Sequence, residues 1–227
     1  MTDETAGLPR PTLQPEAAPD LRRDPTAPLK VSRVAAALFW RDGLTAARGE
    51  DIAASAGISV RTLWRYFRSK EACVEPILES LAAPLLELLD AWPDEMSFEA
   101  YIRGVTRRGP VEFSADQVHG MQMVTLADTE PALRAIWLVI CDAYEKRLRH
   151  IVARRLHEPA DSADVVRITA AVAAANRALN DHLAEEYTRT GRSPEAETLA
   201  AALNACVTES SGGRLGPSTT TTTEDEK

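Results

Sequence analysis

Arg61 and Arg65 lie four residues apart in a short segment, Ser59 to Phe67, and their chemistry suits contact with DNA. On an α-helix this spacing places both guanidinium groups on one side, opposite the apolar Leu63. Two arginines so placed repel each other by roughly 0.2–0.5 kcal/mol in isolation, and an anionic surface would reverse that cost. A guanidinium can donate two hydrogen bonds to guanine, worth roughly 1–3 kcal/mol of discrimination. A solvated charged face would carry the same pair, so the surrounding elements must decide.

The segment before these arginines has the turn and cap residues of a helix-turn-helix. Ile52 and Ala56 lie on one face of a first short helix, and Gly57 can adopt the left-handed conformation that ends a helix at little cost. Ile58 is an apolar residue in the turn, and Ser59 suits the N-cap of the next helix. This order predicts a second helix that is presented to the major groove.

The run from about Val31 to Val74 resembles the TetR (tetracycline-repressor) family of transcriptional regulators. The residues that carry the resemblance are Leu38-Phe39, Gly43, Asp51-Ile52-Ala53, Ala56-Gly57-Ile58-Ser59, Thr62-Leu63, Tyr66-Phe67 and Ser69-Lys70-Glu71. The resemblance implies an N-terminal DNA-binding domain, followed by a helical domain that dimerises and responds to a small molecule. A dimer would place two recognition helices about one DNA turn apart, so that they read a palindrome.

The resemblance also implies roles for single side chains. Base contacts fall to Val60, Arg61, Trp64 and Arg65, and phosphate contacts to Arg48, Ser59, Thr62, Tyr66 and Lys70. Phosphate contacts hold the register on DNA, whereas base contacts select the sequence. The chain departs from the family at Ala47-Arg48-Gly49, where a threonine is usual, and Arg48 would replace its hydroxyl as a phosphate contact.

Charge is distributed unevenly along the chain. The net charge is −8, yet residues 30–72 carry eight basic and four acidic side chains. Residues 73–227 carry 15 basic and 25 acidic side chains. A basic segment ahead of an acidic body favours nucleic-acid binding by that segment alone.

Composition and punctuation predict an all-α fold, because good helix formers dominate and aromatic residues make up only 5%. We expect a disordered arm (1–28), a three-helix DNA-binding domain (29–72), a domain of about six helices (73–210) and a disordered tail (211–227). The expected helices cover about 31–42, 50–56, 59–67, 69–89, 98–113, 116–127, 131–156, 163–189 and 194–207. Pro84 lies deep in the fourth of these and predicts a kink or a break.

The C-terminal helices are expected to serve dimerisation and sensing. The resemblance implies a homodimer through the last two helices, and the alanine-rich stretch 163–189 allows the close approach this needs, although an intramolecular core would explain it equally well. A small-molecule effector pocket is expected among residues 98–189. Its candidate lining is His119, Met123, Trp137, Cys141, Tyr144 and Asn176, and the alternative for this set is ordinary core.

Other classes of function find no support in the sequence. We find no nucleophile elbow, phosphate-binding loop, dinucleotide fingerprint or zinc-ligand spacing, so we expect neither an enzyme nor a cofactor nor a metal. No apolar run is long enough for a membrane span, and the odd, widely spaced cysteines suit a cytoplasmic protein. The expected function is a regulator, most simply a repressor. The alternative is a ligand-binding or adaptor protein that has lost specific DNA binding.

Overall fold

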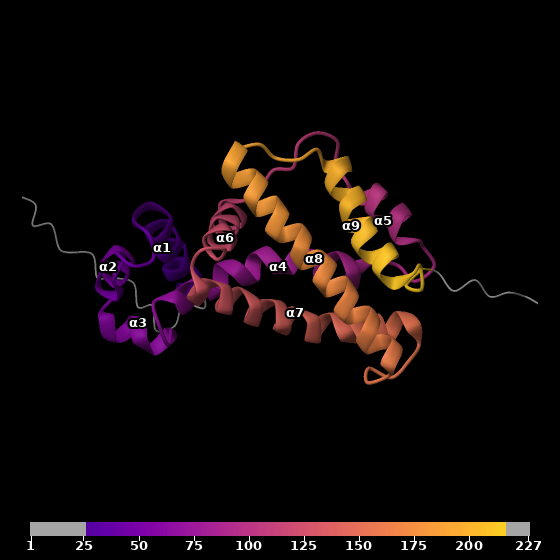
Figure 1. Cartoon of the computed structure of the whole chain (residues 1–227), viewed down its shortest axis with the longest axis horizontal. Coiled ribbons are helices and arrows are strands. Elements are labelled where there is room, and N and C mark those ends of the chain that lie inside the picture. Colours follow the sequence, from indigo (N-terminus) through magenta and orange to yellow (C-terminus); the bar gives the residue numbers. More distant parts are fainter. Residues whose placement is uncertain (1–25, 217–227) are drawn as a thin grey trace, which may run out of the picture.

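The computed structural model describes residues 26–216, and its regular elements are helices (Figure 1). They are α1 (Ala27–Asp42), α2 (Gly49–Ser55), α3 (Val60–Tyr66), the 3-10 helix η1 (Glu71–Val74), α4 (Glu75–Ala91), α5 (Phe98–Val105), α6 (Ala115–Leu126), α7 (Pro131–Leu156), α8 (Ala163–Thr190) and α9 (Ala196–Ser211). Within this range the all-α class is confirmed, with three α-helices in front and six behind.

Helix α1 begins four residues earlier than the sequence suggests, at Ala27. Pro28 sits in its first turn, where the missing N–H is not needed and the fixed φ already suits a helix. Ala27 is fully buried, so packing also favours the earlier start. The remainder of the expected arm, 1–25, and the tail from 217 lie outside the described residues.

The expected fourth helix divides at its start rather than at its proline. Residues 71–74 form η1, and α4 follows directly from Glu75. Pro84 lies inside α4, which continues past it to Ala91, so the expected break is wrong. Buried leucines on both sides of the proline, Leu78 and Leu89, are each 1% exposed, and this tertiary packing holds the helix together across the lost backbone hydrogen bond.

Helix α5 is shorter than expected, because it ends at Val105 instead of Phe113. Gly109 adopts φ +97°, and Pro110 follows it, so the chain leaves helical geometry there. The segment 106–114 instead pairs with the start of α9 through an isolated bridge between Pro110 and Glu195. This pairing links two segments that lie more than 80 residues apart in the sequence.

The C-terminal body is organised around α8, which packs against α6, α7 and α9, while α4 packs against α6 and α7. Figure 1 shows α7 and α8 as the two longest helices of the body, with α5 and α9 at the end away from α1–α3. The centre is apolar, and Trp137, Leu148 and Ile168 are each no more than 1% exposed. No helix in residues 26–216 is long and apolar enough to cross a membrane.

Helix α1 joins the N-terminal domain to the body through two neighbouring side chains. The buried Ser32 hydroxyl accepts a hydrogen bond from the backbone N–H of Ile77 in the first turn of α4, at 3.1 Å. Arg33 makes a two-pronged ion pair with Asp116 on α6, with both N–O distances at 2.7 Å. The domain that carries the arginines therefore contacts the first turns of both α4 and α6.

Candidate nucleic-acid interface

The turn between α2 and α3 has the geometry that its residues predict. Gly57 adopts φ +68°, and the N–H of Ile58 donates to the carbonyl of Ala53 at 2.9 Å. Ser59 is the N-cap of α3, and its Oγ accepts a hydrogen bond from the N–H of Thr62 at 3.1 Å. The two hydroxyls also bond to each other at 2.9 Å. The first turn of α3 is thus fixed by residues within four positions of one another.

Helix α3 buries one side and exposes the two arginines on the other. Leu63 is fully buried in the core of the N-terminal domain, whereas Arg61 and Arg65 are exposed. The Arg65 guanidinium lies 5.0 Å from the centre of the Tyr66 ring. Arg61 forms no ion pair with another residue in the 26–216 range. Two cationic groups on a helix held by a buried leucine are available to an anionic partner.

Trp64 has a second contact that sequence reasoning missed. Its ring lies against the backbone of Gly49 at the start of α2, so closely that an added Cβ on Gly49 would stand 2.3 Å from Cζ2. The indole is still 44% exposed, and its free side faces solvent. A side chain at position 49 would therefore displace the Trp64 ring, and this contact joins residues 15 apart that no local sequence pattern predicts.

The start of α2 is capped without the threonine that is usual in the family. The N–H of Arg48 donates to Oδ2 of Asp51 at 3.1 Å, so a carboxylate of the first turn supplies the cap. The exposed guanidinium of Arg48 can only donate hydrogen bonds and takes no part in that cap. Its expected phosphate contact remains a prediction.

Lys70 is turned toward the protein backbone. Its ammonium donates to the carbonyls of Leu44 and Ala47, at 2.6 and 3.0 Å. These bonds fix the turn that leads from α1 into α2. An ammonium has three donors, so one remains for the phosphate contact that the resemblance implies. The positioning role could not be foreseen, because its acceptors lie 26 and 23 residues away.

Two of the six expected effector residues border hollows of the body, and these two hollows are different ones. Asn176, which is 5% exposed, borders a central cavity of about 90 Å³ among α4, α6, α8 and α9. Tyr144 borders a separate groove between α4 and α7. His119, Met123, Trp137 and Cys141 line neither of these two hollows.

Two of these residues serve the body of the protein. Trp137 donates from Nε1 to Asp181 on α8 at 2.9 Å, and Asp181 also pairs with Arg134 and Arg177. Burial raises the pKa of the Cys141 thiol to about 12, so it stays protonated at neutral pH and is a poor nucleophile. Asp181 was missed because a lone aspartate on a helix gives no sign that three partners converge on it.

In residues 26–216 no cluster of three or more histidine, cysteine or carboxylate side chains could hold a metal.

The ion pair between Arg33 and Asp116 changes the electrostatics where α1 meets the body. The Arg33 guanidinium holds the pKa of Asp116 below its ordinary value, because it donates hydrogen bonds to the charged carboxylate. This ion pair is the clearest charged link between α1 and the body.

Comparison with known proteins agrees with the geometry. Residues 32–77 match the profile described as bacterial regulatory proteins, tetR family. A Mycobacterium tuberculosis protein described as a mycofactocin biosynthesis transcriptional regulator, MftR, is 28% identical over 134 residues, which is 59% of this chain and 68% of the relative. The structure of Salmonella enterica GusR shares the fold at a TM-score of 0.52 with 17% identity, covering 85% of this chain and 100% of that one. The matched residues include the capped helix-turn-helix, which is therefore similar to the DNA-binding segment of tetR-family regulators, and the likeness to GusR extends to the fold of the body.

Proposed function

We propose that the protein is a repressor that binds a palindromic operator as a homodimer and leaves it when a small molecule binds the C-terminal domain. The observation that carries this proposal is α3, which presents Arg61 and Arg65 on the side opposite the buried Leu63. In this proposal the two guanidinium groups contact base edges, with Val60 and the free side of Trp64 beside them. Arg48, Ser59, Thr62, Tyr66 and Lys70 contact phosphates and hold α3 in register.

The outer faces of α8 and α9 support the dimer. On α8, the exposed Ala170, Ala174 and Ala178 follow one another at four-residue spacing. On α9, the half-buried Ala205 adds a further small side chain. Small side chains let helices from two protomers approach closely, and a dimer presents two copies of α3 to adjacent turns of DNA. In solution we expect a dimer whose dissociation follows substitution of Ala174 by a charged residue.

Release by an effector requires that the ligand bind one conformation of the dimer better than the other, and it can shift the equilibrium only by that difference. The tie between the body and α1 at Ser32 and Arg33 supports such coupling, because a shift of α4 or α6 moves the helix that packs against α2.

The test is selection of operators from random duplex DNA, followed by salt titration of the best sequence. We expect an enriched palindrome bound by a dimer, and specific binding lost in Arg61→Met/Arg65→Met. The matched control is Arg107→Met/Arg192→Met, which removes two exposed arginines outside α3. Its net charge equals that of the Arg61→Met/Arg65→Met variant. Loss of a phosphate contact lowers the salt dependence by about one unit of slope per charge, whereas loss of a base contact relaxes the preference for the operator sequence.

Failure takes a different form for each part of the proposal. Equal binding to all sequences would remove the operator, and unchanged binding in the Arg61/Arg65 double variant would remove the base-reading assignment. Absence of any DNA binding would favour the alternative, a helical ligand-binding or adaptor protein. Activation of transcription from the selected operator would replace repression while leaving DNA recognition intact.

A further inference from the structure

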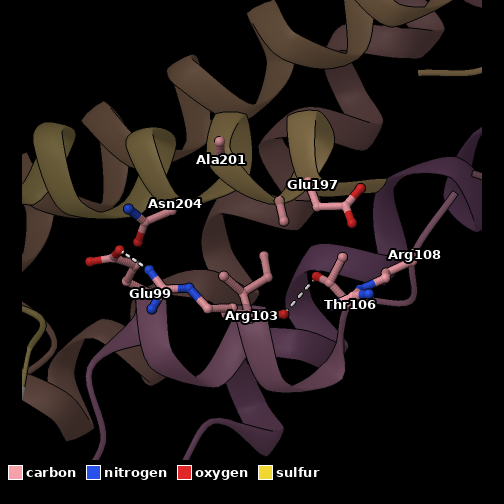
Figure 2. Close-up of a pocket in the computed structure, with 9 residues that line it drawn as sticks. Glu99, Arg103, Thr106, Arg108, Glu197, Ala201 and Asn204 are labelled. Atoms are coloured by element: carbon pink, nitrogen blue, oxygen red, sulfur yellow. Dashed lines mark hydrogen bonds and ion pairs between the residues drawn. The ribbon is translucent and has the colours of Figure 1, made fainter. Parts of the chain in front are cut away.

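A polar pocket of about 450 Å³ lies between α5 and α9, at the end of the body away from the helix-turn-helix (Figure 2). Its volume falls within the range typical of small-molecule sites. None of the six residues expected from sequence to form an effector pocket lines it. Its lining is Glu99, Ile102, Arg103, Thr106, Arg108, Glu197, Ala200, Ala201 and Asn204.

The charged groups of this pocket are arranged in two unlike sets. At one end Glu99 and Arg103 form an ion pair with each other along α5. At the other end Arg108 and Glu197 lie near each other, and no ion pair joins either of them to a residue in the described part of the chain (Figure 2). An unpaired cation and an unpaired anion at one end of a hollow suit a ligand that carries both charges.

Asn204 adds a hydrogen-bonding requirement at the opposite end. Its Oδ1 is buried and has no hydrogen-bond partner, and its side chain extends from α9 toward Glu99 and Arg103 (Figure 2). A buried acceptor without a partner destabilises the fold, and rotation of the amide would turn it toward a ligand N–H group. Glu197 and Asn204 lie seven residues apart on α9, about 10 Å along the helix axis.

Ile102 and the alanines of α9 line the hollow between the two ends. We propose that this pocket binds a zwitterionic α-amino acid with a long side chain that ends in an N–H donor. The ammonium group faces Glu197, the carboxylate faces Arg108, the aliphatic stem crosses Ile102, and the terminal donor reaches Asn204. The lining carries two acidic and two basic groups, so a ligand with no net charge meets a pocket with no net charge.

The pocket is joined to α6 by a short stretch of chain. The N–H of Ala196 donates to the carbonyl of Gly109 at 2.8 Å, and the N–H of Val111 donates to the carbonyl of Pro194 at 2.9 Å. Arg108 directly precedes the paired residue Gly109, and Glu197 directly follows the paired residue Ala196 in the first turn of α9. A ligand held between them acts on the segment that enters α6 at Ala115.

Helix α6 then carries the effect to α1. Ser114 caps α6, and Asp116 in its first turn holds Arg33 of α1. The regulatory step of this inference rests on the proposed function, whereas the binding step does not. Ligand binding is therefore measured without DNA, so that failure of the site and failure of the repressor remain distinguishable.

The first experiment is calorimetric titration of the full chain with each standard L-amino acid and with L-citrulline, up to about 10 mM so that millimolar Kd values are covered. Glutamine or citrulline is expected to bind more tightly than norleucine, which lacks the terminal donor. N-acetyl-L-citrulline, which lacks the ammonium group, is expected to bind at least about tenfold more weakly than citrulline. Absence of binding by every amino acid overturns the proposal.

Three variants locate the ligand. Arg108→Met and Glu197→Gln are expected to weaken binding about tenfold or more, and Arg107→Met, on a neighbouring exposed arginine outside the lining, is expected to leave it unchanged. Asn204→Leu is expected to abolish the preference for donor-ending side chains while raising Tm, because it removes the unsatisfied acceptor. Binding that is indifferent to Arg108→Met and Asn204→Leu places the ligand elsewhere and overturns the proposal.

The coupling is tested by adding the bound amino acid to the protein on its selected operator. We expect the ligand to weaken operator binding by the wild-type protein. In Arg33→Met we expect this weakening to be at least about threefold smaller, while the variant binds the ligand normally. This result supports the route through α6. Unchanged operator affinity in the presence of saturating ligand overturns the regulatory step and leaves the binding site standing.

Discussion

The helix-turn-helix and the C-terminal body differ in how their polar side chains are held in place. In the N-terminal domain Ser59 caps α3 through residues within four positions, and the arginines stay exposed. In the body some ion pairs lie within one helix, but others join helices that are distant in the sequence. Asp181 on α8 accepts hydrogen bonds from Trp137 and Arg134 of α7, which lie more than 40 residues earlier in the sequence. The exposed face of α3 is set by contacts that are local in sequence. The body is also held by ion pairs between helices that meet only in the folded protein.

Arg155 is the extreme case in the body. Its side chain is 2% exposed, and it donates to the carbonyls of Leu215 and Trp92 at 2.9 and 3.1 Å. Its guanidinium also lies 3.3 Å from the centre of the Trp92 ring, and it pairs with Asp94. One side chain of α7 therefore holds both the α4–α5 connection and the chain end beyond α9, where Leu215 is buried although the sequence assigns it to the tail.

The largest expected effect comes from removing this connection. Arg155→Ala leaves buried carbonyls without donors and is expected to lower the free energy of unfolding by roughly 2–4 kcal/mol. Urea denaturation followed by circular dichroism measures it. The matched control is the adjacent Arg154→Ala, which breaks an exposed pair with Asp90 and should cost less than about 1 kcal/mol. Equal effects for the two arginines would contradict the contrast between buried and exposed pairing.

A smaller effect tests the N-terminal domain, where the contact between Gly49 and Trp64 is one of the contacts that are not local in sequence. Gly49→Ala forces the indole away and is expected to cost roughly 1–3 kcal/mol of stability. It should also weaken operator binding, because α3 is displaced from α2. In Gly104→Ala the added methyl group meets open space on α5, and a neutral or slightly stabilising change of at most about 1 kcal/mol is expected. Unaltered operator affinity in Gly49→Ala would show that Trp64 is not set by this glycine.

The smallest effect concerns the junction between the two regions. Because Arg33 lowers the pKa of Asp116 in the folded protein, the pair stabilises at pH values above the unfolded pKa, and this contribution is lost as pH falls through the folded pKa. With Arg33 half-exposed, it amounts to less than about 1 kcal/mol. In Arg33→Met we expect the pKa of Asp116, followed by NMR, to rise toward its ordinary value. A pKa that stays depressed would assign the shift to the capped start of α6 instead.

Much of the N-terminal site was predictable, because its determinants are close in sequence. Gly57 ends α2, Ser59 starts α3, and the spacing of Arg61 and Arg65 sets their common face. The long helices α7 and α8 were also anticipated closely, because their apolar periodicity and their proline and serine starts are local properties. The early end of α5 was within reach as well, since Gly109-Pro110 is a turn signal.

The residues that line the pocket between α5 and α9 could not be predicted in the same way. An apolar stripe on a helix predicts that its side chains face the interior. It does not predict whether they meet other side chains or line a cavity. Met123 and Trp137 face the core, while the larger pocket opens between α5 and α9, about 100 residues apart in the sequence. Arg108 and Asn204 belong to no periodic sequence pattern. Their common place in one pocket is therefore seen only once α5 and α9 are packed together.

The sequence by itself determined the all-α class, the helix-turn-helix with its exposed arginines, and most helix boundaries, because helix starts, stops and apolar faces depend on residues within a few positions of each other. The tertiary structure alone decided that Lys70 fastens the turn before α2, that Gly49 makes room for Trp64, and that a charged pocket forms beside α9. These features depend on how helices distant in the chain cross and pack, and packing is set by the whole set of contacts rather than by any single segment.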